Sequence, residues 1–172
     1  LRFWCARTTV LRRALSRAIM AQHSHTHVID EDMETEIALR LRKADQRFTP
    51  ARRALVAALV TAKGPMAIAD ILLVTEKMPQ SSVYRNLTVL ESVGVVSRLM
   101  SNDEYGRFEL SENLIGHHHH LICQQCGAMS DFNIPHDMEQ QLDSTLAQLA
   151  SANGFALEHH RLDIVGKCSN CK

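Results

Sequence analysis

Apolar residues in the first half of the chain recur three and four positions apart, the spacing of helices with one buried face. Breaks at Thr49-Pro50 and at Pro79 divide the pattern, because threonine caps helices and proline interrupts them. We expect Ser81 or Ser82 to cap the last segment. The pattern predicts four helices, over residues 33–43, 50–63, 68–75 and 82–93.

The spacing changes after these helices. Residues 95–100 and 107–110 each have the composition of a short strand, and the polar residues 102–106 between them are typical of a turn. Helices followed by a two-stranded hairpin describe a winged helix-turn-helix, a DNA-binding unit. We therefore predict a winged-helix DNA-binding domain over residues 31–110, followed by a hinge at residues 111–116.

The remaining residues, 117–172, predict a second and smaller domain. Strands are expected over 117–123 and 129–134, a helix over 138–150 and a last strand over 155–165. The whole chain is thus expected to be α+β, with a winged helix followed by a small α/β domain. A unit of this size needs support beyond its own hydrophobic core.

Composition fits a globular protein, with 45% hydrophobic and 22% charged residues, and no apolar run reaches the ~20 residues of a membrane span. The charge is uneven. Residues 1–19 hold five of the 19 basic residues and no acid, so the rest has 14 basic residues against 19 acidic ones. We interpret 1–30 as a leader or disordered arm and expect Met20 to open the native protein. No secretory signal pattern is present, so a cytoplasmic setting is expected.

Four cysteines form two pairs with the spacing of metal ligands, Cys123-x-x-Cys126 and Cys168-x-x-Cys171. Each such turn places two thiolates at neighbouring corners of a tetrahedron, and two turns complete a zinc site with four sulfurs. A thioredoxin-like redox motif needs only one pair beside a βαβ unit, which this pattern does not contain. The spacing therefore predicts a structural zinc site.

Four consecutive histidines, His117-His118-His119-His120, precede the first cysteine pair. Successive side chains on a strand point to opposite faces, so His117 and His119 share one face and His118 and His120 the other. A solvated polar strand end is the plain alternative, but the run leads straight into an apolar strand. We expect two separate metal sites, completed by residues from this group: Glu109, Asp131, Glu139, Asp143, His159 and His160.

The predicted fourth helix contains Ser82-Val83-Tyr84-Arg85, and the first residues of such a helix face the major groove in helix-turn-helix proteins. Arginine binds phosphate or guanine, and tyrosine contacts phosphate or a thymine methyl. A cluster of basic residues earlier in the chain adds a candidate phosphate-binding face, although a solvated helix face explains such a cluster equally well. Its members are Arg40, Arg42, Lys43, Arg47, Arg52 and Arg53.

Taken together, these motifs resemble the ferric uptake regulator (Fur) family over nearly all of residues 34–172. The most specific segments are 82–87, 117–127 and 159–166, the last of which reads HHRLDIVG before the second cysteine pair. The resemblance implies a homodimeric, metal-dependent transcriptional repressor of metal-homeostasis genes that binds a double-stranded DNA operator. It also implies that residues 117–172 form the dimerisation domain, and that metal favours the operator-binding shape.

The resemblance assigns roles residue by residue. The four cysteines correspond to the structural zinc site, and a second divalent metal, Fe²⁺, Zn²⁺ or Mn²⁺, is expected at a regulatory site between the domains. Residues corresponding to DNA contacts are Ser82, Tyr84, Arg85, Arg52 and Arg47. Residues corresponding to the regulatory site are His118, His120, Glu109 and Asp131. Residues corresponding to a third site are His117, His119 and His160, with Glu139 and Asp143 as rival helix acids.

The chain departs from the family pattern at two positions of the regulatory site. The family often takes a histidine from just before its third helix, but the corresponding residue is Pro65, which cannot bind metal. The missing ligand is either absent or borrowed, for example from His23, His25 or His27. The carboxylate after the first cysteine pair is Asp131, as in the peroxide-sensing branch. Metal-catalysed oxidation at His118 or His120 is therefore an alternative mode of sensing.

Two other classes of protein fit the sequence less well than a regulator does. A zinc enzyme keeps an open coordination position and a nearby general base, and no HExxH or HxE…PCxxC motif occurs in the sequence. A zinc-stabilised protein-interaction module would not bind duplex DNA in a salt-dependent way. We expect no enzymatic activity.

Overall fold

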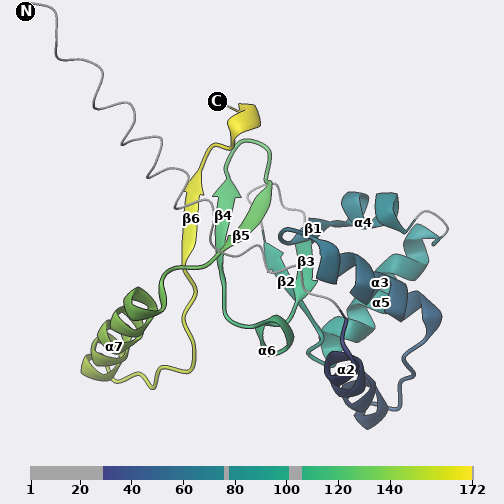
Figure 1. The fold of residues 1–172 in the computed structure, drawn as a ribbon, viewed down its shortest axis with the longest axis horizontal. Coiled ribbons are helices and arrows are strands. Elements are labelled where there is room, and N and C mark those ends of the chain that lie inside the picture. The colour runs from purple at the N-terminus through teal and green to yellow at the C-terminus, as the bar shows by residue number, and fades with distance from the viewer. Residues whose placement is uncertain (1–28, 76–77, 101–105, 172) are drawn as a thin grey trace, which may run out of the picture.

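The computed structural model describes residues 29–75, 78–100 and 106–171. Residues 1–28 of the predicted arm, with Met20, His23, His25 and His27, lie outside the described residues, as does most of the predicted turn at 102–106. Asp30, the last residue of the predicted arm, instead caps the first described helix, since its side chain accepts a hydrogen bond from the Met33 amide. The described part forms two lobes side by side (Figure 1). One lobe contains four helices and a small sheet, and the other contains a second sheet with a long helix beyond it.

Four helices form the first lobe, as predicted: α2 (Glu31–Lys43), α3 (Pro50–Thr61), α4 (Ile68–Val74) and α5 (Gln80–Ser92). The Thr49 side chain accepts a hydrogen bond from the Arg52 amide, which confirms the predicted start of α3. The predicted serine cap of α5 is wrong. The helix begins at Gln80 after Pro79, and no side chain caps it.

The helices pack around one apolar core. Each helix contributes residues three or four positions apart, and the innermost of these are almost completely buried. The largest are Ile37, Leu41, Leu55, Val56, Ile71, Val83, Leu87 and Leu90.

A three-stranded antiparallel sheet completes the first lobe. Strands β2 (Val96–Met100) and β3 (Gly106–Leu110) form the predicted hairpin, with Ser97 opposite Glu109. The short strand β1 (Met66–Ala67) pairs with the other edge of β3 and was not predicted, because two residues carry no periodic pattern. Helices with this hairpin form a winged helix, so the fold prediction for this part is confirmed.

The second lobe is a three-stranded sheet in the order β5-β4-β6. Strand β4 (His119–Cys123) pairs antiparallel with β5 (Met129–Phe132) and parallel with β6 (Asp163–Gly166). Helix α7 (His136–Ala152) connects β5 to the segment before β6, and η1 (Ser169–Cys171) follows β6. None of the described helices combines the length and apolarity needed to cross a bilayer.

Two predicted elements differ from the structure. The last strand was predicted over 155–165, but only residues 163–166 form β6, and residues 155–162 form neither helix nor strand. The apolar side chains that led to this prediction lie on the surface and not in the core; Phe155, for example, is 73% exposed. In the predicted hinge, residues Glu112–Ile115 form the short helix α6.

The two lobes touch through the wing and the loop before β1. The Arg107 guanidinium on β3 donates through Nε to the Gly127 carbonyl at 2.6 Å. The Asp131 amide on β5 donates to the Lys63 carbonyl at 3.2 Å. A small apolar cluster, Leu99, Ile122 and Met129, joins the wing to the second sheet. The position of the second sheet relative to the wing is thus set by backbone groups as well as side chains.

Gly64 allows the close approach of this loop to β5, which leads to a first prediction. A Cβ at this position would lie 2.9 Å from both the Met129 carbonyl oxygen and the Ser130 Cα, and neither backbone atom moves easily. Gly64→Ala should therefore lower the free energy of unfolding by about 1–3 kcal/mol, the usual cost of overpacking. Thermal unfolding at constant zinc measures the change. Gly166→Ala is the control, because its Cβ would meet nothing within 4 Å; equal losses in both variants would contradict the prediction.

Candidate metal centres

The four cysteines of the two CxxC pairs lie together at one end of the second sheet. Parallel pairing sets Cys123 opposite Gly166, so the second pair follows directly beside the first. Their four sulfur atoms lie within 4.8 Å of one another, and the Cys126 and Cys168 sulfurs are 3.8 Å apart. Sulfurs bound at about 2.3 Å in a tetrahedron are separated by about this distance. The thiols are free, and they could hold a zinc ion.

The thiols differ in acidity. Hydrogen bonds from the backbone amides of Cys168 and Cys126 lower the pKa of Cys123 to about 6. The neighbouring Cys168 and Cys126 thiols raise the pKa of Cys171 to about 12. One thiolate forms readily, and its charge opposes the next deprotonation. A bound cation removes this opposition, because it stabilises all four thiolates at once.

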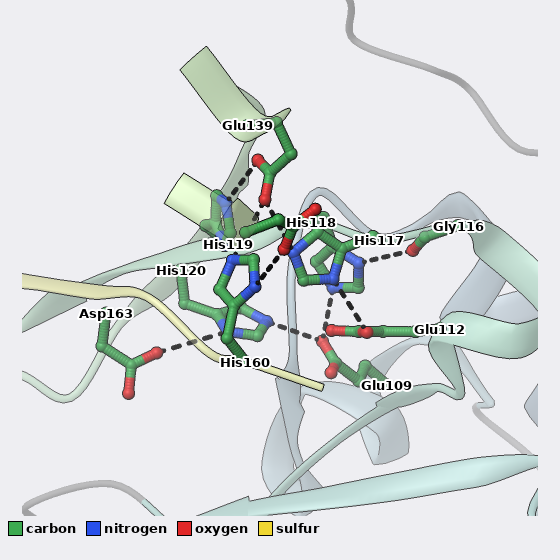
Figure 2. A network of polar contacts seen from close by, with 11 residues as sticks. Glu109, Glu112, Gly116, His117, His118, His119, His120, Glu139, His160 and Asp163 are labelled. Atoms are coloured by element: carbon green, nitrogen blue, oxygen red, sulfur yellow. Dashed lines mark hydrogen bonds and ion pairs between the residues drawn. The ribbon is translucent and has the colours of Figure 1, made fainter. Parts of the chain in front are cut away.

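A second cluster lies between the lobes, around Glu109. Phe108 and Leu110 point into the core of the first lobe, so Glu109 between them points the opposite way, toward the second lobe. Its carboxylate Oε2 lies 3.0 Å from His120 Nε2 and 3.3 Å from His118 Nε2 (Figure 2). Asp131 completes the group, with Oδ1 3.8 Å from His120 Nε2. These four side chains, called here the regulatory cluster, could hold a metal ion.

Burial and hydrogen bonding act in opposite directions in the regulatory cluster. Burial alone would raise the pKa of Glu109, but hydrogen bonds to His118 and His120 lower it overall. Burial alone would lower the pKa of His118. The hydrogen bonds to Glu109 and to the Gly116 carbonyl outweigh burial and raise that pKa to about 9. Without metal, a proton on His118 therefore balances the buried Glu109 charge.

Pro65 is buried in the loop that contacts β5. The Lys63 carbonyl of this loop accepts from the Asp131 amide, so Pro65 follows closely on a residue that touches the regulatory cluster. The Pro65 side chain has no metal-binding atom, so this position adds no ligand to the regulatory cluster. Whether a histidine of the arm replaces it lies outside the described residues.

A third cluster lies on the other face of the histidine run. His119 Nε2 lies 3.0 Å from Glu139 Oε2, and His160 Nε2 and His117 Nε2 lie 3.0 and 3.4 Å from Glu139 Oε1 (Figure 2). These four residues, called here the third cluster, could also hold a metal ion. The rival acid Asp143 lies behind His160, with Oδ1 3.0 Å from Nδ1, on the side away from Glu139.

Burial alone would raise the pKa of Glu139, but the hydrogen bond from His119 and the charges of the three histidines lower it overall. Glu139 Oε1 and His160 Nε2 are buried and lie 3.0 Å apart as an ion-pair contact, yet neither atom makes a hydrogen bond. Polar atoms in such positions are usually satisfied by a bound species. Their arrangement around one carboxylate fits a cation.

Several partners of these clusters were missed from the sequence. Asp163 lies opposite His120 in the parallel pair β4–β6, with Oδ1 3.5 Å from His120 Nδ1. Glu112 on α6 lies 3.1 Å from His117 Nδ1. Asp163 stands within a segment that carried the family resemblance, but only the register of β6 places it beside His120. No signal in the sequence pointed to Glu112.

The predicted DNA contacts divide into exposed and buried residues. Tyr84 is 48% exposed on α5, and Arg85 beside it is exposed as well. Arg47 is exposed in the loop before α3, and Ser82 is half-buried on α5. Arg52 is buried, and its guanidinium donates to Asn86, the Arg47 carbonyl and Gln46. Direct DNA contact by Arg52 does not fit these bonds. The bond to Asn86 joins α3 to α5, and the other two hold the loop before α3.

A winged helix whose wing shares a metal-ligand cluster with a second lobe is the architecture of a metal-responsive DNA-binding regulator. The ferric uptake regulator family pattern matches residues 43–165. The chain therefore belongs to the ferric uptake regulator family. Members of this family are DNA-binding transcriptional regulators that act as dimers, and not enzymes, which confirms the expectation of no enzymatic activity.

Individual relatives support the same assignment. The peroxide-responsive repressor PerR of Staphylococcus epidermidis is 35% identical over 148 residues, which cover 84% of this chain and 93% of that protein. Among solved structures, Fur of Vibrio cholerae matches with a TM-score of 0.59 and 25% identity over 76% of this chain and 98% of its own. Fur of Helicobacter pylori matches with a TM-score of 0.63 and 22% identity over 82% and 92%, which supports the fold.

The raised pKa of His118 predicts how metal affinity depends on pH. A cation must displace the proton that His118 carries below a pKa of about 9. Affinity of the regulatory cluster for Mn²⁺ should therefore rise with pH from about 6.5, by up to about tenfold per unit, and level off above about 9. Calorimetry in buffers of different ionisation enthalpy should show release of about one proton at pH 7.5. An affinity that stays constant between pH 6.5 and 8.5 would contradict the assignment.

Proposed function

We propose that this protein is a metal-dependent transcriptional repressor of metal-homeostasis genes, and that a divalent cation in the regulatory cluster favours the operator-binding arrangement of its lobes. One observation carries the proposal. The carboxylate of Glu109 on the wing lies between His118 and His120 of the second lobe. A cation shared by these residues prefers one placement of the wing.

The residues explain how binding is transmitted. Glu109 is fixed to the winged helix by its strand, and His120 is fixed to the second sheet by β4, which His118 directly precedes. Without metal, a proton shared between Glu109 and the histidines holds these side chains together. A divalent cation holds them more strongly, because it carries two positive charges and binds several ligands at once. Because metal and operator both favour the same arrangement, each should increase affinity for the other by the same factor.

The remaining clusters have separate roles in this proposal. Zinc at the four cysteines holds the second lobe together and contributes on the order of 10 kcal/mol to its folding. The third cluster is a further divalent site with Glu139, rather than Asp143, as its acid. Helicobacter pylori Fur has three functional metal binding sites, and three clusters of metal-binding side chains are also present among the residues described here. The ligand set of the regulatory cluster suits Fe²⁺, Zn²⁺ or Mn²⁺.

We also propose that the protein is a homodimer that binds a double-stranded operator in the cytoplasm. Tyr84 and Arg85 on the exposed face of α5 contact the operator, and Arg47 contacts phosphate. The dimer forms through the second lobe, where β6 is an edge strand and several apolar side chains are uncovered. Free CxxC thiols suit a reducing compartment. The uncovered side chains are Leu149, Phe155, Leu157, Ile164 and Val165.

Loss of the regulatory histidines tests this proposal. The double substitution His118→Ala with His120→Ala should abolish Mn²⁺-dependent operator binding, while dimerisation and one tightly bound zinc per chain remain. Gel-shift titration with candidate palindromic promoters, sizing and zinc content measure the three properties. Metal-dependent binding that survives in this variant would refute the proposal.

Two control variants separate metal sensing from other losses. His136→Ala with His159→Ala removes two exposed histidines that belong to no cluster, and it should leave the metal response unchanged. Arg85→Ala should weaken operator binding at every metal concentration, with a cost of about 1–3 kcal/mol, and leave metal affinity unchanged.

A peroxide-sensing regulator is the second candidate function. It is favoured by Asp131 and by the peroxide-responsive repressors among the relatives of this chain, one of which is 35% identical. Fe²⁺ held by His118 and His120 would place the site of peroxide reduction against these two rings. Oxygen would then be added to one of them, and the ligand set would be lost.

The predicted product distinguishes the two candidates. Protein loaded with Fe²⁺ and exposed to micromolar hydrogen peroxide should gain about 16 Da on the peptide that contains His118 and His120, and lose operator binding. Protein loaded with Mn²⁺ should do neither, because this ion does not supply the same electron to peroxide. Peptide mass spectrometry makes the measurement. An unmodified peptide with Fe²⁺ would leave metal sensing as the function.

A further inference from the structure

The connector at residues 111–116 contacts one histidine of each divalent-metal cluster. The Gly116 carbonyl lies 3.0 Å from His118 Nδ1, and Glu112 Oε2 lies 3.1 Å from His117 Nδ1 (Figure 2). In both rings the other nitrogen, Nε2, faces the cluster. An acceptor at Nδ1 keeps the proton there and leaves Nε2 free to bind a metal. Glu112 therefore orients His117 as Gly116 orients His118.

His117 needs such an orienting partner more than its neighbours in the third cluster. Its side chain is 34% exposed, whereas His119 is 1% exposed and His160 is 9% exposed. Packing fixes the two buried rings, and Asp143 additionally contacts His160 Nδ1. The His117 ring is open to solvent on one side, so its direction depends on the contact with Glu112.

Helix α6, which carries Glu112, is held against the first lobe by backbone and apolar contacts. It begins two residues after the end of β3, and the Ser111 amide donates to the Val95 carbonyl at 3.0 Å. Leu114 and Ile115 pack against the hydrophobic core of the winged helix. The Glu112–His117 contact is thus a link between lobes, formed on the face of the histidine run opposite to Glu109.

We propose that Glu112 is a positioning residue that couples a divalent cation in the third cluster to the connector, and through it to the winged helix. The proposal rests on the proposed function only in assuming that the third cluster binds a divalent cation. With the cation in place, His117 is fixed, Glu112 is held by it, and α6 is ordered against the second lobe. The third cluster then stabilises the same placement of the wing as the regulatory cluster does.

The test isolates the third cluster. In a protein that retains its zinc and carries His118→Ala and His120→Ala, Co²⁺ titration by calorimetry and visible absorption reports the third cluster alone. Glu112→Ala in this background should weaken Co²⁺ binding by about 10–100-fold, the usual effect of removing an orienting carboxylate. Glu112→Gln should recover part of the loss, since its amide oxygen still accepts from Nδ1. Asn113→Ala, which changes an exposed neighbour on α6, should have no effect.

Coupling requires a second readout that a loss of affinity alone would not change. Amides of Leu114, Ile115 and Gly116 donate to carbonyls within the connector, so their hydrogen exchange reports the order of α6. Saturating Co²⁺ should slow this exchange several-fold in the background protein. In the Glu112→Ala variant, saturated at higher Co²⁺, exchange should not slow.

The outcomes separate this proposal from the proposed function. Unchanged Co²⁺ affinity in Glu112→Ala, or no Co²⁺ binding in the background protein, overturns the positioning role. Exchange that does not respond to Co²⁺ when Glu112 is present overturns the coupling. Each of these results leaves the metal-dependent operator binding of the unmodified protein intact, whereas failure of the proposed function appears as loss of that binding.

Discussion

The arrangement of the two lobes depends on one buried carboxylate. Glu109 is 7% exposed, and a charge in that position is stable only beside a partner of opposite charge. The second lobe supplies this partner as a protonated histidine, and the cation proposed for the regulatory cluster would take the place of that proton. The interface therefore never lacks a counter-charge. In the proposed function, metal binding changes how strongly, and in what geometry, the lobes are held.

Most of the fold was predictable because its signals are local. Helices with one apolar face, the Thr49-Pro50 start and the alternating wing strands each specify their own structure. The prediction failed where local signals were weak or misleading. Strand β1 has only two residues, which is too short to show a period. Residues 155–162 have apolar side chains typical of a strand, but Phe155 and Leu157 are exposed and do not pack in the core of this chain.

The candidate site was predictable to the extent that strand alternation governs it. Odd and even histidines of the run lie on opposite faces because β4 continues their alternation, and the family resemblance supplied their partners. Tertiary packing decided the rest. Glu139 and Asp143 both contact His160, but only Glu139 lies on the turn of α7 that also meets His117 and His119. The burial of Arg52 depends on how α3 meets α5. Neither contact produces a periodic pattern in the sequence.

The parallel pairing of β4 with β6 has a consequence for how the protein is made. Cys126 and Cys168 are 42 positions apart, and the second cysteine pair reaches the first only when β6 has docked beside β4. Contacts between such distant segments form late, because a long loop must close first. During synthesis the winged helix can fold while the second lobe still lacks β6, its last strand. In the nascent chain the DNA-binding unit can therefore be folded before the four cysteines of the zinc site have come together.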